Sequence, residues 1–121
     1  MKNSQALRMW FVIHFFVDYL AAIPLFIFPF QSLSFLGWHT IDPLATRIIA
    51  SALFAIGGVS LIARNATPEV YREILTLKII WSFFVTTALV IALMQGEITW
   101  GILVSIILFV FFGLVWAYYR L

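Results

Sequence analysis

The chain has 121 residues and no cysteine. The missing cysteine excludes disulfide bonds, thiolate metal sites, iron–sulfur clusters and a cysteine nucleophile, and it leaves the redox compartment undetermined. Charge is also scarce, because only 10% of the residues are Asp, Glu, Lys or Arg, whereas a soluble domain has about a quarter. The formal net charge of +2 is too small and too scattered to indicate binding to nucleic acid.

The sequence also lacks the motifs of most enzymes. It contains no glycine-rich phosphate loop, no serine or cysteine nucleophile arrangement and no cluster of carboxylates for hydrolysis. The segments between its apolar stretches are too short to hold an active site outside a membrane. We therefore expect a non-enzymatic protein, and we predict no cofactor.

Apolar residues make up most of the chain, with 64% hydrophobic and 18% aromatic residues. A membrane-spanning helix needs about 20 mostly apolar residues. Four stretches have this length: approximately 9–30, 43–63, 71–94 and 98–119. The sequence thus predicts an all-α integral membrane protein, with residues 1–121 forming a single four-span transmembrane domain in a lipid bilayer. Residues 31–38 are expected to lie as a short amphipathic segment at the membrane interface.

Turn and capping residues separate the four stretches. Pro29 is expected to close the first stretch. Asp42 and Pro43 supply a helix N-cap and a proline at the first helical position before the second stretch, and residues 67–69 (Thr-Pro-Glu) repeat this pattern before the third. Residues 95–97 (Gln-Gly-Glu) predict a tight turn before the fourth. Such short connections favour antiparallel neighbours, and hence an up-down four-helix transmembrane bundle.

Apart from Arg47 and Lys78, which lie within the second and third spans, lysine and arginine lie on one predicted side of this bundle. They precede the first span, lie near the connection between the second and third spans, and follow the last: Lys2, Arg8, Arg64, Arg72 and Arg120. Residues 31–42 and 95–97 contain neither type. By the positive-inside rule, both termini are predicted to be cytoplasmic, in a cytoplasmic (cell) membrane. Tyr71 and Trp116 are expected among the aromatic residues at the inner interface.

Asp18 lies in the middle of the first span, with His14 one helical turn before it. Counted from Met9, His14 lies about 8 Å and Asp18 about 14 Å into the membrane. A charged group near the bilayer centre costs roughly 2.5–3.5 kcal/mol or more. Asp18 is therefore expected to have a partner, a bound proton or a function.

The third span carries a matching polar stripe. Counted from Tyr71, Lys78 lies about 10 Å and Ser82 about 16 Å deep. If the first and third spans are neighbours, Lys78 lies in height between His14 and Asp18. An Asp18–Lys78 ion pair would neutralise both buried charges. The sequence therefore predicts one buried polar cluster of four residues: His14, Asp18, Lys78 and Ser82.

This cluster has two interpretations. Polar groups between membrane helices often only hold the helices together. An ionisable residue in a membrane can instead serve proton-coupled or ligand-dependent work. No metal site is predicted, because His14 and Asp18 supply two ligands and no third completes the set. A bis-histidine haem is excluded within one subunit, because His39 is predicted on the opposite side of the membrane.

Arg47 lies one turn inside the outer end of the second span. Arg47 has two interpretations of its own. In the first, its long side chain extends to the outer lipid headgroups. In the second it lies at the rim of a cavity, where it binds an anionic headgroup or Asp42.

Several short motifs give the chain a recurrent layout. They are Ile23-Pro24-Leu25, Leu36-Gly37-Trp38, Asp42-Pro43, Arg47, Ala52, Gly57-Gly58 and Ala63-Arg64-Asn65. With these motifs the chain resembles the small, largely uncharacterised four-helix prokaryotic membrane proteins described as DoxX-like. The resemblance implies a four-helix bundle in a prokaryotic cytoplasmic membrane and no defined catalytic residues. Because some DoxX-like proteins are associated with respiratory or redox membrane complexes, it also implies a partner-subunit role.

Two functional hypotheses follow. The first is a non-enzymatic membrane protein that binds an apolar small molecule, a lipid or a partner membrane subunit around the polar cluster. The alternative is a homodimeric, proton-coupled transporter in which Asp18 is the proton and substrate site. Small multidrug transporters are similar in size and use a carboxylate in the first helix, but the rest of their signature is not evident in this chain.

Overall fold

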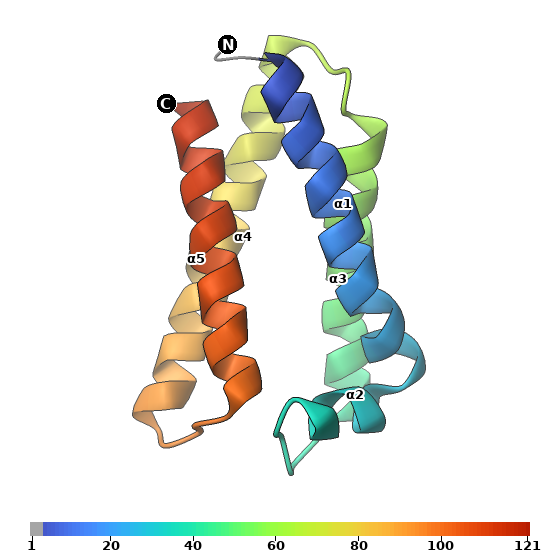
Figure 1. Cartoon of the computed structure of the whole chain (residues 1–121), viewed down its shortest axis with the longest axis vertical. Helices are drawn as coiled ribbons and strands as arrows, with labels where there is room; N and C mark the ends of the chain where they lie inside the picture. Colours follow the sequence, from blue (N-terminus) through green and yellow to red (C-terminus); the bar gives the residue numbers. More distant parts are fainter. Residues whose placement is uncertain (1–3) are drawn as a thin grey trace. The chain divides into compact units, whose positions relative to one another are not determined.

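The computed structural model describes residues 4–121, which form five helices and no strand (Figure 1). The helices are α1 (Ser4–Ile27), α2 (Pro29–Phe35), α3 (Pro43–Ile62), α4 (Pro68–Met94) and α5 (Trp100–Arg120). All except α2 are long and apolar enough to cross a membrane. The predicted all-helical class and the presence of four candidate membrane spans are confirmed.

The first helix differs in its bounds from the predicted span. It begins at Ser4 rather than at Met9, because a helix can continue beyond the apolar stretch that marks a membrane span. It ends at Ile27, and Pro29 begins α2 instead of closing the first span. Phe28 lies between them with φ of −126° and ψ of 63°. A residue before proline avoids the helical conformation, so Pro29 ends one helix and starts the next.

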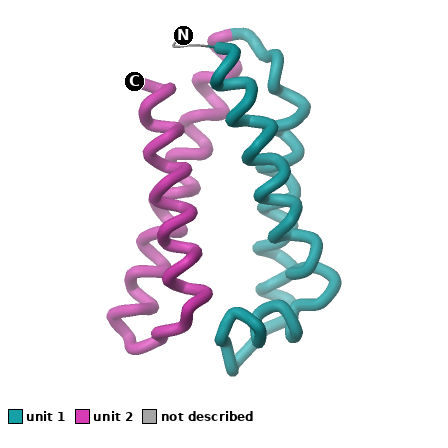
Figure 2. Tube along the Cα trace, in the orientation of Figure 1, with its two compact units in different colours: residues 1–67 teal, residues 68–121 magenta. Residues whose placement is uncertain are grey.

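The chain divides into two compact units, residues 1–67 and residues 68–121 (Figure 2). Unit 1 contains α1, α2 and α3, and unit 2 contains α4 and α5. Each unit is built on one hairpin of two long helices (Figure 1).

In unit 1, α1 and α3 run antiparallel and pack along each other, and α2 lies in the connection between them (Figure 1). α2 ends at Phe35, and Gly37 turns the chain away with a left-handed φ of 101°. The N–H groups of Gly37 and Trp38 donate hydrogen bonds back into the helix. Asp42 caps α3 as predicted. Its Oδ1 accepts hydrogen bonds from the N–H groups of Leu44 and Ala45 at 3.0 and 3.1 Å.

The two long helices of unit 1 approach each other closely at Gly57. A Cβ atom added to Gly57 would lie 2.8 Å from Cβ of Asp18 and 3.2 Å from the ring of Tyr19. The Tyr19 hydroxyl donates a hydrogen bond to the carbonyl of Phe54 in α3 at 3.2 Å. Small residues let membrane helices approach in this way, so the glycine in α3 allows α1 to pack against it.

Unit 2 is an antiparallel hairpin whose tight turn was predicted correctly. Gly96 has a left-handed φ of +90°, and the N–H groups of Gly96 and Glu97 donate back into α4. α5 begins at Trp100 because the hydroxyl oxygen of Thr99 accepts a hydrogen bond from the N–H of Ile102 at 3.1 Å. The predicted fourth span began two residues earlier, at residue 98, because the apolar Ile98 extends the hydrophobic stretch.

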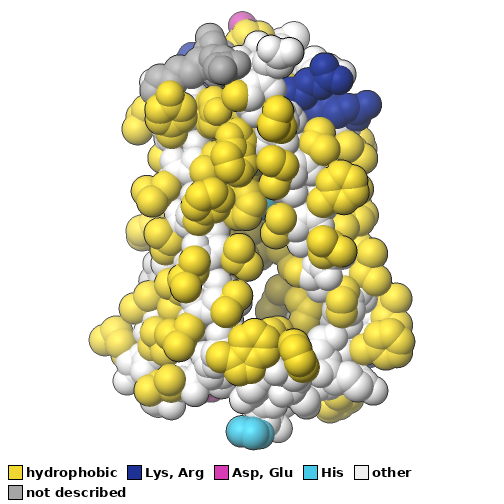
Figure 3. Space-filling view, in the orientation of Figure 1, with side chains coloured by type: hydrophobic (Ala, Val, Ile, Leu, Met, Phe, Trp, Pro, Cys, Tyr) yellow, Lys and Arg dark blue, Asp and Glu magenta, His cyan; other side chains and the backbone are white. Residues whose placement is uncertain are grey.

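Large hydrophobic side chains are exposed along all four long helices. One example from each is Leu20 (73% exposed), Ile62 (82%), Phe83 (64%) and Leu114 (67%). In Figure 3, hydrophobic side chains cover the visible helix surfaces, and the visible Lys and Arg side chains lie near helix ends. Apolar surface on this scale is unusual for a soluble monomer. Together with the helix lengths, it indicates a multi-pass membrane protein in a lipid bilayer.

Candidate functional site

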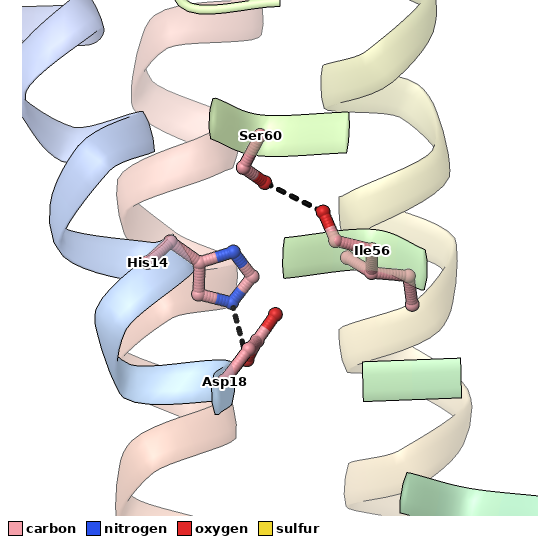
Figure 4. A network of polar contacts seen from close by, with 4 residues as sticks. All are labelled: His14, Asp18, Ile56 and Ser60. Carbon is pink, nitrogen blue, oxygen red and sulfur yellow. Dashed lines mark hydrogen bonds and ion pairs between the residues drawn. The ribbon is translucent and has the colours of Figure 1, made fainter. Parts of the chain in front are cut away.

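The candidate site of unit 1 is the pair of His14 and Asp18 in α1. A spacing of four residues places the two side chains one above the other on the same helix face. Nε2 of His14 lies 3.3 Å from Oδ1 of Asp18. Both residues are only 5% exposed, and both project from α1 toward α3 (Figure 4). Unit 1 therefore buries a carboxylate and an imidazole in direct contact.

The α3 side of this pair is formed by small and hydroxyl-bearing residues. Gly57 lies against Cβ of Asp18. Ser60, one turn further along α3, is fully buried, and its Oγ donates a hydrogen bond to the carbonyl of Ile56 at 2.7 Å (Figure 4). Ser60 thus bonds to its own helix in the manner common for serine in membrane helices.

This arrangement can hold or pass a proton between the imidazole and the carboxylate. Neutral histidine has one donor and one acceptor nitrogen, and an ionised aspartate only accepts. The pair could equally orient a bound molecule through a hydrogen bond. Within residues 4–121, no group of three or more His, Cys, Asp or Glu side chains is arranged to hold a metal ion.

Unit 2 has a buried polar group of its own, on α4. Lys78 is fully buried, and its Nζ lies 4.5 Å from the ring centroid of Trp116 in α5. The face of a tryptophan ring carries partial negative charge and attracts a cation that lies over it. Ser82, one turn further along α4, is 5% exposed, and a Cβ atom on Gly113 would lie 3.3 Å from its Cβ. Lys78 and Ser82 therefore share the α4 face that packs on α5.

Two further contacts join α4 and α5, one on each side of Lys78 along the helix. Toward the start of α4, Nε of Arg120 donates a hydrogen bond to Oγ1 of Thr76 at 3.2 Å. Toward the middle of α4, the rings of Trp81 and Phe109 meet edge to face with centroids 6.0 Å apart. Lys78 thus lies in the α4–α5 interface between an aromatic contact on the side of Trp81 and a polar contact on the side of Thr76.

The structure brings the predicted site residues together in two pairs. His14 contacts Asp18 in unit 1, and Lys78 and Ser82 share one face of α4 in unit 2. The predicted Asp18–Lys78 ion pair would join the two units and stays a prediction.

Arg47 has a partner that was not predicted from the sequence. Its Nε donates a hydrogen bond to the carbonyl of Phe26 in the last turn of α1 at 2.9 Å. Asp42 accepts hydrogen bonds from the start of its own helix. A basic side chain at a helix C-terminus satisfies a free carbonyl and complements the helix dipole. Contact of the exposed Arg47 with a lipid headgroup stays a prediction.

The aromatic partner of Lys78 in unit 2 was not predicted from the sequence. Trp116 and Tyr71 are 0% and 4% exposed and are therefore packed within the protein, and their predicted depth at the membrane interface stays a prediction. The available signal was the spacing within α5, because Phe109, Gly113 and Trp116 follow one helix face. A lysine inside an apolar span favours an aromatic partner, because a ring face attracts the cation.

Comparison with known proteins found no relative of this chain. No family model matches the chain, and no curated protein or solved structure does. The DoxX-like resemblance therefore stays a prediction, and the function is inferred from the buried polar residues themselves.

Proposed function

We propose that the four long helices form an antiparallel up-down bundle in a prokaryotic cytoplasmic membrane, with both termini in the cytoplasm. The distribution of arginine supports this orientation. In unit 1, Arg8 is near the start of α1 and Arg64 follows α3; in unit 2, Arg72 is near the start of α4 and Arg120 ends α5. Each hairpin thus carries these charges at the end that we assign to the cytoplasm.

The orientation can be tested by cysteine labelling, because the chain has no cysteine of its own. Thr40 and Asn65 are exposed residues in the two connections of interest. A membrane-impermeant thiol reagent applied to intact cells should label Thr40→Cys and leave Asn65→Cys unlabelled. Equal labelling of both positions from outside would contradict the proposed orientation.

We further propose that the protein is a non-enzymatic membrane subunit that binds an apolar small molecule, a lipid or a partner membrane subunit. Its polar contacts would come from four residues: His14, Asp18, Lys78 and Ser82. The buried contact between His14 and Asp18 carries this proposal. Ionisable groups are expensive inside a membrane and commonly mark sites of function there.

Native mass spectrometry of the gently purified protein tests this proposal directly. The wild-type protein should retain a small molecule, a lipid or another subunit, and Asp18→Asn should reduce that retention. Asp42→Asn is the matched control, because Asp42 is an exposed helix cap outside the site. Retention that is absent from the wild type, or equal in both folded variants, would contradict the proposal.

The alternative function is proton-coupled transport by a homodimer. It is favoured by the direct contact of a buried carboxylate with an imidazole, since both groups can exchange a proton. In this case Asp18→Asn should abolish proton-driven substrate flux in liposomes and leave the helical fold intact. Unchanged flux in this variant would exclude Asp18 as the proton and substrate site.

The DoxX-like resemblance favours the subunit role over the transporter. A subunit of a respiratory or redox complex should co-purify with a membrane assembly larger than a homo-oligomer. Purification in a mild detergent, followed by mass spectrometry of the accompanying chains, tests this expectation. If the purified assembly contained copies of this chain and no other protein, the partner-subunit role would be contradicted.

A further inference from the structure

Arg47 is a charged residue on an apolar helix surface in unit 1. It is exposed and is the fifth residue of α3, about 6 Å along the helix from Pro43. Unit 1 leaves its neighbours on α3 uncovered, with Leu44 68% and Ile48 60% exposed. α3 has 20 residues and is about 30 Å long, the thickness of a hydrocarbon core. Arg47 therefore faces lipid, and its long side chain reaches the headgroups at the Pro43 end of α3.

A hydrogen bond to α1 fixes the position of the Arg47 guanidinium. Nε donates to the carbonyl of Phe26, in the last turn of α1, at 2.9 Å. This bond uses one of the five N–H donors of arginine, and the other four are on the two Nη atoms. The negative end of a helix dipole amounts to about half an elementary charge. α1 thus offsets only part of the positive charge on Arg47.

The carboxylates of unit 1 do not neutralise the rest of this charge. Unit 1 contains two acidic residues, Asp18 and Asp42. Asp18 contacts His14 and lies eight residues before Phe26, about 12 Å along α1. Asp42 is the N-cap of α3. Among residues 4–67, neither carboxylate forms an ion pair with Arg47. A cation at a lipid-facing surface is costly without a counter-charge, so Arg47 favours an anion from the membrane.

We infer that the guanidinium of Arg47 binds the phosphate of one anionic glycerophospholipid, in the outer leaflet of the proposed orientation. The two Nη atoms form a fork that matches two oxygens of a phosphate. The acyl chains of the lipid lie against the exposed side chains of Leu44 and Ile48. A zwitterionic phospholipid fits less well, because the ammonium of its own headgroup offsets the phosphate charge. This headgroup site is separate from the buried polar cluster and goes beyond the proposed function.

The test measures lipid binding by native mass spectrometry of delipidated protein in detergent. Phosphatidylglycerol and phosphatidylcholine with identical acyl chains are the two probes, and they differ only in the headgroup. The wild type should bind the first phosphatidylglycerol molecule more tightly than the first phosphatidylcholine molecule. Free sn-glycerol 3-phosphate should not displace the bound lipid, because this anion has no acyl chains to contact the apolar surface.

Substitutions of Arg47 should change this preference. Arg47→Gln should weaken binding of the first phosphatidylglycerol about tenfold, the effect of one charge-assisted contact, and leave phosphatidylcholine binding unchanged. Arg47→Lys keeps the charge and loses the fork, so its affinity should be intermediate. Arg72→Gln is the matched control, because Arg72 is exposed near the start of α4 and has Glu69 one turn before it. This control should bind phosphatidylglycerol as the wild type does.

Three results would overturn the inference. Equal affinities of the wild type for the two lipids would remove the headgroup preference, and a preference that appears only in Glu97→Gln would identify Glu97 of unit 2 as the partner of Arg47. Equal phosphatidylglycerol affinities in the wild type and Arg47→Gln would place the lipid elsewhere. Displacement by glycerol phosphate would indicate a site for a free anion.

The same measurement separates this site from the proposed function. Asp18→Asn should keep the preference for phosphatidylglycerol, because Asp18 is buried and distant along α1 from Phe26. If only Arg47→Gln lost its ligand, the headgroup site would be supported and the proposed function contradicted. If only Asp18→Asn lost its ligand, the proposed function would be supported and the headgroup site rejected.

Discussion

The two units bury their polar side chains in different ways. In unit 1, Asp18 contacts His14 on its own helix, and α3 comes close through Gly57. In unit 2, the ammonium of Lys78 lies on the ring of Trp116 in the opposite helix. Unit 1 thus combines a polar contact within one helix with a close backbone approach. Unit 2 uses a large aromatic surface.

This difference predicts opposite sensitivities to side-chain volume. A helix pair that meets at glycine has no room for an added methyl group. A helix pair that is filled by tryptophan loses many contacts when that ring is removed. Added volume should therefore damage unit 1 most, and removed volume should damage unit 2 most.

The largest effect is expected from Trp116→Ala in unit 2. The side chain is fully buried, stacks on Phe112 and supports the ammonium of Lys78. Its removal should lower the free energy of unfolding by about 3–5 kcal/mol, measured by reversible unfolding in mixed micelles. Trp100→Ala, at a position that is 47% exposed, should cost only about 0.5 kcal/mol. Similar losses in the two variants would contradict the aromatic support of Lys78.

A matched pair of glycine substitutions tests the other half of the comparison. Gly57→Ala places a methyl group 2.8 Å from Cβ of Asp18, whereas Gly113→Ala places one 3.3 Å from Cβ of Ser82. Overpacking should make Gly57→Ala less stable by about 1–3 kcal/mol. The higher helix propensity of alanine, about 1 kcal/mol, favours both variants equally, and only in Gly113→Ala is the contact mild enough for this gain to offset it. If Gly113→Ala were the more damaging change in the same unfolding assay, the assignment of close packing to unit 1 would be wrong.

A double-mutant cycle tests whether Asp18 and Lys78 interact, as their predicted depths suggest. Asp18→Asn and Lys78→Met should each lower the unfolding free energy. The double variant should recover part of the loss, with a coupling energy of about 0.5–2 kcal/mol. Additive losses in the cycle would reject the ion pair and leave each residue with the partner in its own unit.

Sequence alone predicted the helical class and most helix ends, because these depend on local chemistry. Asp42 caps α3 and Gly96 closes the turn after α4, as expected from residue type and position. Thr99 carries the same kind of cap and was missed, because the apolar Ile98 before it was counted as part of the span. Pro29 was identified as a boundary but assigned to the wrong helix, since proline suits a first helical turn.

The candidate site was predictable along one helix and unpredictable across two. The spacing of His14 and Asp18 alone places them on one face, and the structure has them in contact. The position of Trp116 over Lys78 depends on the register of α5 against α4. That register is set by packing at residues such as Gly113 and Ser82, and single-helix periodicity contains no information about it.

The smallest expected effect concerns the end of unit 1, where Arg47 bonds to the carbonyl of Phe26. Arg47→Gln removes the positive charge at the α1 terminus, and the loss should be at most about 1 kcal/mol because the side chain is exposed to solvent screening. Arg47→Lys keeps the charge and should retain most of the stability. High salt should narrow the difference between wild type and Arg47→Gln. If glutamine and lysine were equally destabilising at all salt concentrations, the geometry of the Nε hydrogen bond, rather than the helix dipole, would determine the role of Arg47.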